Sequence, residues 1–206
     1  MVLQYDGLFI TKMEQIIDKL NRNLIRRREL VDKAIFLDVD GVLNGKKTKA
    51  RCQGYIGIDS KKVKLLAKLV NATDATIILS SSWKHYWDKN PEYCDKFGTY
   101  LNKKLLQENL TIFDKTYDKK KWRRGEGIKK YIEEHNVKNF VVLDDEIFDF
   151  EEYESIYKNW IQTDYYTGGI NEEQIELAIR KLNGEDICSH NDINLASTNT
   201  HIGLEL

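Results

Sequence analysis

Cysteine, histidine and proline are scarce in this chain. Among its 206 residues there are three cysteines, four histidines and one proline. The cysteines, Cys52, Cys94 and Cys188, lie far apart, are odd in number and form no CxxC pair. A disulfide framework and a zinc site are therefore not indicated. The histidines are equally dispersed and show no ligand spacing, which argues against a soft-metal site.

Long apolar runs are also missing. No stretch approaches the roughly 20 apolar residues that a membrane-spanning helix needs. The N-terminus lacks the charged and then apolar pattern of a signal peptide. Apolar residues make up 41% of the chain and charged residues 32%, as in a folded soluble domain. We therefore expect a cytoplasmic protein without a membrane partner.

The charge balance is nearly neutral, with a net charge of -1, so no global field attracts a partner. Local charge is less even. Each of two basic clusters is either a solvated loop or a phosphate-binding surface. The clusters comprise Lys46, Lys47, Lys49 and Arg51, and Lys115, Lys119, Lys120, Lys121, Arg123 and Arg124.

Short apolar runs alternate with segments of helical periodicity, which predicts a Rossmann-like α/β fold: a parallel sheet with helices on both faces. The expected strands cover residues 34–39, 75–79, 110–113, 139–146 and 160–164. The expected helices cover residues 11–33, 60–70, 91–109, 126–135 and 171–182. We divide the chain into a helical extension (1–33), one catalytic domain (34–183) and a polar tail (184–206).

Three of the expected strands end in polar residues. Asp38 and Asp40 lie at the end of the first, the serines 80–82 follow the second, and Asp144 and Asp145 lie at the end of another. The carboxyl ends of parallel strands share one edge of a sheet, where ligands bind. Carboxylates gathered there repel unless a cation neutralises them, and Mg²⁺ prefers such oxygen ligands. The sequence thus predicts a magnesium site at this edge.

The stretch "DVDGVLN", with the later serines, basic residue and acidic pair, resembles the haloacid dehalogenase (HAD) superfamily of aspartate-nucleophile phosphatases. The resemblance covers about residues 35–164. It implies that Asp38 attacks phosphorus and becomes an aspartyl-phosphate. It also implies that Asp40 protonates the leaving oxygen and later deprotonates water. Gly41 allows a tight turn beside the two acids and is a candidate substrate-binding residue.

The same resemblance assigns the remaining parts of the site. Ser80, with Ser81 as the alternative, would bind a phosphate oxygen. Arg124, with Lys121 as its rival, would stabilise charge on the phosphoryl group. The metal ligands would come from Asp38, Asp40, Asp144 and Asp145. They would be side-chain carboxylates, and the main-chain carbonyl of Asp40 would be a further ligand. Asp149 is expected to be a solvated loop acid, with a position near the metal as the alternative.

Residues 44–59 and 83–123 are too short to hold the cap domain that many superfamily members insert there. A capless site is open, and the resemblance associates it with bulky substrates. "LSSSWK", "RGEGI", "LDDE" and "TDYYTGGI" also resemble phosphatase modules of nucleic-acid end-repair proteins.

Basic and aromatic residues near these motifs are also candidates for nucleic-acid contacts. Lys46 and Lys47 would contact an oligonucleotide backbone. Trp83, Tyr86 and Trp87 either stack on a base or pack beneath the site.

Three functions remain open at this point. The first is a Mg²⁺-dependent phosphatase acting on nucleic-acid ends. The second is a small-molecule or nucleotide phosphatase. The third is a noncatalytic phosphate-binding protein, which the presence of all four sequence elements disfavours.

Overall fold

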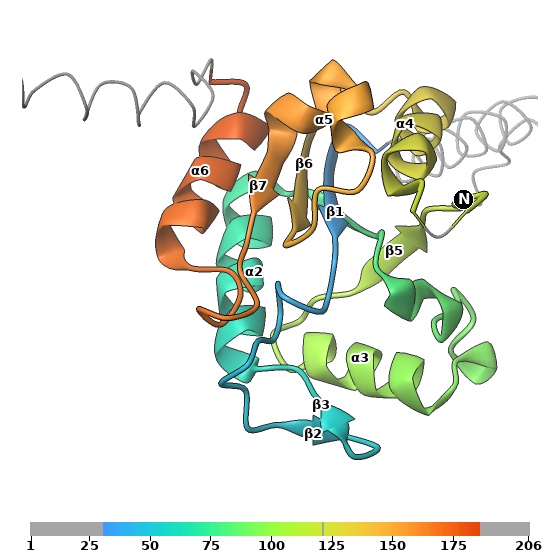
Figure 1. Cartoon of the computed structure of the whole chain (residues 1–206), viewed down its shortest axis with the longest axis vertical. Coiled ribbons are helices and arrows are strands. Elements are labelled where there is room, and N and C mark those ends of the chain that lie inside the picture. The colour runs from blue at the N-terminus through green and yellow to red at the C-terminus, as the bar shows by residue number, and fades with distance from the viewer. Residues whose placement is uncertain (1–30, 121, 186–206) are drawn as a thin grey trace, which may run out of the picture.

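The computed structural model describes residues 31–120 and 122–185. Within them a five-stranded sheet has the order β5-β4-β1-β6-β7, and every pair is parallel (Figure 1). The predicted α/β fold is therefore confirmed. The strands are β1 (Lys33–Leu37), β4 (Thr76–Leu79), β5 (Ile112–Lys115), β6 (Asn139–Asp144) and β7 (Trp160–Gln162).

Helices cover both faces of the sheet, which is why β1 is a continuous apolar run. Ile35 and Leu37 pack into one core and Ala34 and Phe36 into the other, because side chains alternate along a strand. The first core is closed by α2 (Ser60–Thr73), α3 (Lys96–Leu106) and α6 (Glu172–Leu182), and the second by α4 (Arg124–His135) and α5 (Glu154–Asn159). Figure 1 shows α2 and α6 side by side on their face.

Side-chain caps fix where several helices begin. Asp59 accepts a hydrogen bond from the Lys61 amide at 2.9 Å and starts α2. The helix predicted over 91–109 is instead interrupted: a 3₁₀ turn, η2 (Pro91–Tyr93), is followed by extended Cys94, and α3 begins only after the Asp95 cap.

Asn109 has a left-handed φ of 58°, so the chain turns at this residue. The strand predicted over 110–113 begins after the turn and covers Ile112–Lys115.

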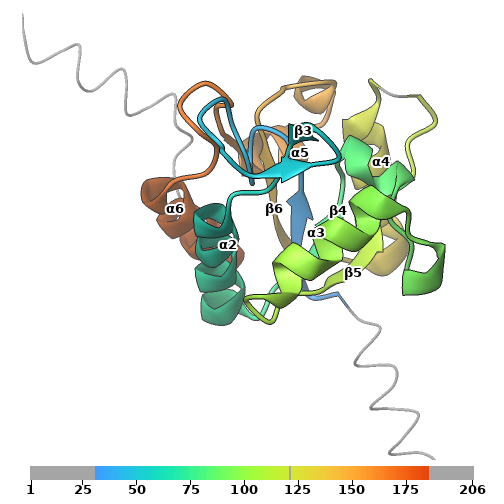
Figure 2. The same ribbon diagram turned by 90° about the horizontal axis from the view of Figure 1, so that it is seen from below.

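Several short elements were not predicted, because two to six residues are too few to establish a periodicity. A hairpin of β2 (Arg51–Cys52) and β3 (Tyr55–Ile56) forms within the expected loop after β1. It lies beyond the carboxyl edge of the sheet and beside α3, where the Tyr55 and Phe97 rings are 6.0 Å apart (Figures 1 and 2). The 3₁₀ turns η1 (Ser82–His85) and η3 (Phe150–Glu152) and helix α5 were missed as well. No large cap domain is present in the described part of the chain.

All but the last three residues of the helix predicted over 11–33 lie outside the described residues, as do Lys121 and the tail beyond residue 185. β1 begins at Lys33, one residue before the predicted start. Among the helices that the structure describes, none has the length and apolar character required to cross a bilayer.

Candidate active site

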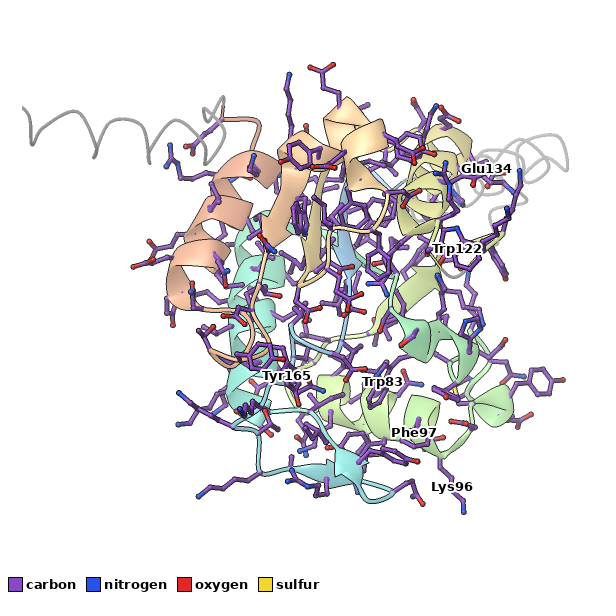
Figure 3. All side chains as sticks on the ribbon, in the orientation of Figure 1. Trp83, Lys96, Phe97, Trp122, Glu134 and Tyr165 are labelled. Atoms are coloured by element: carbon purple, nitrogen blue, oxygen red, sulfur yellow. The ribbon has the colours of Figure 1, made fainter. Side chains whose placement is uncertain are left out.

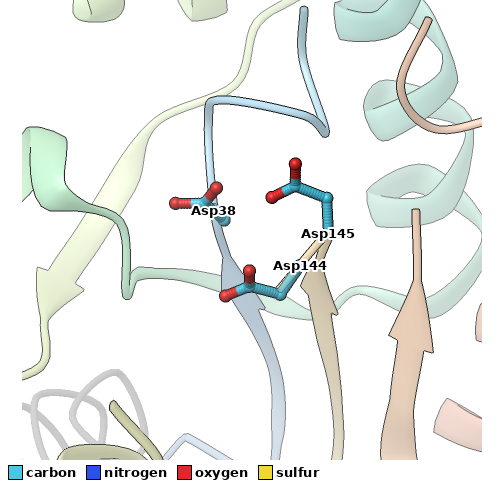
Figure 4. A group of neighbouring side chains, drawn as sticks. All are labelled: Asp38, Asp144 and Asp145. Atoms are coloured by element: carbon cyan, nitrogen blue, oxygen red, sulfur yellow. The ribbon is translucent and has the colours of Figure 1, made fainter. Parts of the chain in front are cut away.

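Three carboxylates meet at the carboxyl edge of the sheet (Figure 4). One oxygen each of Asp38, Asp144 and Asp145 lies within 4.8 Å of the others. The strand ladder continues past the end of β1, since the Asp38 amide donates to the Leu143 carbonyl at 2.9 Å. Neighbouring parallel strands therefore bring together acids that are more than 100 residues apart in sequence, as predicted.

Burial and mutual repulsion disfavour the ionised forms of these three carboxyl groups. Burial is the main reason that the pKa of Asp38 is raised. Burial and the charge of Asp38 raise the pKa of Asp144 to about 8. The same two causes raise the pKa of Asp145 to about 6. The cluster would thus retain protons near neutral pH unless a cation took their place.

Arg124 supplies one positive charge to the cluster. Its Nη1 atom lies 3.2 Å from Asp38 Oδ1 and is also hydrogen-bonded to Asp144 Oδ2. The guanidinium stacks on the Phe148 ring at 4.0 Å. The side chain predicted to stabilise the phosphoryl group therefore contacts the predicted nucleophile. Its rival, Lys121, lies outside the described residues.

Asp149 holds the start of the helix that carries Arg124. Its carboxylate accepts hydrogen bonds from the amides of Gly125 at 2.6 Å and Glu126 at 3.1 Å. Only 8% of Asp149 is exposed, so its prediction as a solvated loop acid was wrong. Arg123 points away from the cluster and pairs with Glu152 at 2.5 Å.

Asp40 lies beside the cluster without joining it. Its two carboxylate oxygens each accept a hydrogen bond at 2.8 Å, one from Asn44 Nδ2 and the other from Trp83 Nε1. Asn44 is fully buried and also accepts from the Gly41 amide at 3.0 Å. A metal contribution from Asp40 therefore depends on its main-chain carbonyl, because its carboxylate is already held.

The tryptophans after the serines are too deeply buried to stack on a base. Trp83 is 5% exposed and packs edge-on against Phe97 at 5.8 Å (Figure 3). Trp87 is 4% exposed and donates to Asn102 at 2.9 Å. Of the two interpretations of Trp83, substrate contact is thus corrected in favour of packing: its N–H holds Asp40. Tyr86, 43% exposed, does line the cleft.

The two candidate serines have different surroundings. Ser81 accepts from the Val39 and Trp83 amides, each at 3.3 Å, and its hydroxyl offsets part of the rise in the pKa of Asp38. Ser80 Oγ and Arg124 Nε are the two buried side-chain polar atoms without a hydrogen-bond partner among the described residues. A phosphate oxygen or water would satisfy such groups. Together with the oxygen cluster, these unpaired atoms fit a Mg²⁺–phosphate site.

Gly41 makes room for one carboxylate of the cluster, that of Asp145. Its φ is +76°, and a Cβ atom there would lie 2.1 Å from Asp145 Cγ. The Thr163 hydroxyl fixes the same turn by donating to the Gly41 carbonyl at 2.7 Å. The structure therefore gives Gly41 a packing role within the site.

The acids open into a cleft of about 1150 Å³. Lys84, which the sequence did not identify, lines it although it is only 6% exposed. Its ammonium contacts Asp118 and lies 3.3 Å from Thr116 Oγ1, and burial lowers its pKa. The Lys46 ammonium lies 5.5 Å from the centre of the ring of Tyr166, which lines the cleft.

Lys47 is exposed, and neither it nor Lys46 lines the cleft.

A parallel α/β sheet whose carboxyl edge gathers acids, serines and a helix-opening arginine is the arrangement of a HAD-type hydrolase domain. The chain belongs to the family described as the HAD domain in Swiss Army Knife RNA repair proteins, whose family model matches residues 34–175. No curated protein matches the chain at a significant level. Family membership supports a hydrolase of the phosphatase type.

Proposed function

We propose that this protein is a Mg²⁺-dependent phosphatase that hydrolyses a terminal phosphomonoester on nucleic acid through an aspartyl-phosphate at Asp38. The observation that carries the proposal is the contact of Arg124 with both Asp38 and Asp144, with Asp145 completing the cluster. The nucleic-acid substrate is supported by the RNA repair proteins in which this family occurs and by the open, capless cleft.

Asp38 and Asp40 divide the chemistry. An Asp38 oxygen attacks phosphorus, the bond from phosphorus to the leaving oxygen breaks, and Asp40 gives that oxygen its proton. Asp40 then removes a proton from water, which attacks the aspartyl-phosphate, releases inorganic phosphate and restores Asp38. The hydrogen bonds from Asn44 and Trp83 keep the Asp40 carboxylate in place for both steps. Arg124 and the Ser80 or Ser81 hydroxyl orient the phosphoryl oxygens.

The carboxylates of Asp38, Asp144 and Asp145 would hold Mg²⁺, with the main-chain carbonyl of Asp40 as a further ligand. The ion would supply positive charge that neutralises these carboxylates and the phosphoryl oxygens. Asp145 can lie beside Asp38 and Asp144 because Gly41 has no side chain, which would otherwise occupy the position of the Asp145 carboxylate.

The experiment measures phosphate release with Mg²⁺ from 3′- and 5′-phosphorylated oligonucleotides, mononucleotides, phosphopeptides and sugar phosphates. We expect wild-type turnover to favour one oligonucleotide end and Asp38→Asn to abolish turnover, because an amide oxygen is a poor nucleophile. Asp32→Asn, an exposed aspartate paired with Lys138 away from the site, is the matched control.

Each alternative function has its own outcome. Selective turnover of a mononucleotide or sugar phosphate would replace end processing with small-molecule hydrolysis. Retained phosphate binding without turnover of any substrate would indicate a noncatalytic binding protein. Full activity of Asp38→Asn would overturn the assignment of the nucleophile.

A further inference from the structure

A second hollow, of about 440 Å³, lies next to the active-site cleft. Tyr117, Asp118 and Lys119 line both spaces. The segment 116–120, here called the ridge loop, therefore separates two hollows that together lead from Asp38 toward the outer surface of α4. The remaining lining residues of the second hollow are Glu126, Lys129, Lys130, Glu133 and Tyr153.

The ridge loop is anchored from both sides. Asp118 pairs with the buried ammonium of Lys84, and the side chains of this pair are 9% and 7% exposed. The Thr116 amide donates to the Leu79 carbonyl at 3.0 Å. On the other side, a Cβ atom at Gly127 of α4 would lie 2.3 Å from Asp118 Oδ1 and 3.1 Å from the Tyr117 carbonyl oxygen, so the absence of a side chain there makes room for the loop. A loop held in this way needs little ordering when a ligand binds.

The exposed side of the ridge loop combines an aromatic ring with positive charge. Tyr117 is 72% exposed, although large apolar surface is normally buried. Lys119 and Lys120 follow it and are exposed, and the Lys119 ammonium lies 3.3 Å from Glu126. Tyr86 presents a second ring from the cleft wall. Exposed aromatics with neighbouring cations are the surface on which single-stranded nucleic acid binds, by base stacking and phosphate contact.

We infer, resting on the proposed function, that the ridge loop is the docking platform for the single strand whose terminal phosphate enters the cleft. A nucleotide next to the terminal one stacks on Tyr117, and the strand continues over Lys119 and Lys120 into the second hollow. A compact phosphorylated metabolite would fill the cleft alone and leave this hollow unused. Lys46 and Lys47, predicted to contact the backbone, line neither hollow.

The test compares kcat/KM for a phosphorylated single strand of roughly ten nucleotides with kcat/KM for p-nitrophenyl phosphate, which has no second nucleotide to stack on Tyr117 or to extend into the second hollow. Tyr117→Ala is expected to lower the ratio of the two values about ten-fold, because stacking on one ring contributes on that order. Tyr117→Phe retains a ring and is expected to restore most of the ratio. Tyr93→Ala is the matched control, since Tyr93 is 75% exposed and lines neither hollow.

The charge is tested with the double variant Lys119→Ala/Lys120→Ala. It is expected to weaken binding of a fluorescent oligonucleotide, measured by anisotropy, and to reduce the salt dependence of binding. The control removes two exposed lysines of α2, Lys61→Ala/Lys64→Ala, which line neither hollow.

The outcomes separate this inference from the proposed function. Turnover of the oligonucleotide with an unchanged ratio in Tyr117→Ala would overturn the platform and leave the phosphatase standing. No turnover of any substrate would overturn the phosphatase, while loss of oligonucleotide binding in Tyr117→Ala would still support the platform. Displacement of the oligonucleotide by a phosphopeptide of equal affinity would also overturn the platform, in favour of a phosphoprotein partner.

Discussion

At the scale of single residues, the proposed acid and base is defined by the two donors that hold it. Asp40 is exposed toward the cleft, yet its carboxylate cannot rotate freely, because each oxygen accepts a hydrogen bond. Trp83 and Asn44 are both buried, so their own positions are fixed by packing. A proton donor must point at the leaving oxygen to act, and a rigid pair of partners provides that direction.

Removing one partner tests this role. Trp83→Phe keeps an aromatic ring against Phe97 and deletes the N–H donor to Asp40. We expect kcat to fall about ten-fold with KM little changed, because substrate still binds while the acid is less well aimed. Steady-state kinetics on the preferred oligonucleotide measures both constants.

Trp87→Phe provides the matched control, because it deletes an equally buried N–H donor whose partner is Asn102. Equal losses of kcat in the two variants would show that the effect comes from packing and would contradict a specific role for Trp83.

At the scale of elements, helix α4 depends on a residue from another segment. Arg123 precedes the helix and makes no side-chain cap, so the first amides are left without a local partner. Asp149, which follows β6, provides the missing acceptor and places its negative charge at the positive end of the helix. The same contact positions Arg124, the first residue of α4.

Asp149→Ala should therefore lower both stability and turnover. Loss of two hydrogen bonds to a buried carboxylate is expected to reduce the free energy of unfolding by about 1–3 kcal/mol. Displacement of Arg124 is expected to lower kcat as well. Urea unfolding and phosphate release measure the two effects.

The control is Asp95→Ala, which removes the cap of α3, where Asp95 accepts from the amides of Phe97 and Gly98. It should cost similar stability and leave kcat near that of wild type. Normal kcat in Asp149→Ala would show that Arg124 is placed without this cap.

The contrast between predicted and unpredicted elements has a physical basis. Strand ends of a parallel sheet meet at one edge whatever the loops do, so Asp38 and Asp144 could be brought together from sequence. Arg124 could be identified because the family resemblance implies a basic residue at the start of a helix, and Arg124 lies just before the helix predicted over 126–135. Lys84, Asn44 and Asp149 act through tertiary contacts between loops, and nothing in their local sequence shows those contacts. Trp83 was left with two interpretations because an aromatic residue after a strand can face either substrate or core.

At the scale of the whole molecule, the fold places more negative charge at the sheet edge than it balances. Arg124 pairs with Asp38 and Asp144, which are the two buried acids of the three in the cluster. Folding therefore favours their protonated forms, as the raised pKa values show. Stability of the metal-free protein is consequently linked to pH and to any cation that binds the cluster.

The sign of the linkage leads to a final prediction. The pKa of Asp144 rises from its ordinary value of 3.8 to about 8 on folding, so the folded state binds more protons between these values. Stability of the metal-free protein should then fall as pH rises through this window. In EDTA, thermal unfolding is expected at a lower temperature at pH 8 than at pH 6.

Saturating Mg²⁺ is expected to raise the unfolding temperature more at pH 8 than at pH 6. An ion that binds only the folded state stabilises that state. The ion competes with protons for the same carboxylate oxygens, and fewer protons are bound at pH 8. Asp144→Asn carries no titrating carboxyl at this position and should flatten the pH dependence in EDTA. Differential scanning calorimetry of the wild type and this variant measures both effects. An unfolding temperature in EDTA that rises from pH 6 to pH 8, with no response to Mg²⁺, would mean that the acids are neutralised within the protein and that the metal site lies elsewhere.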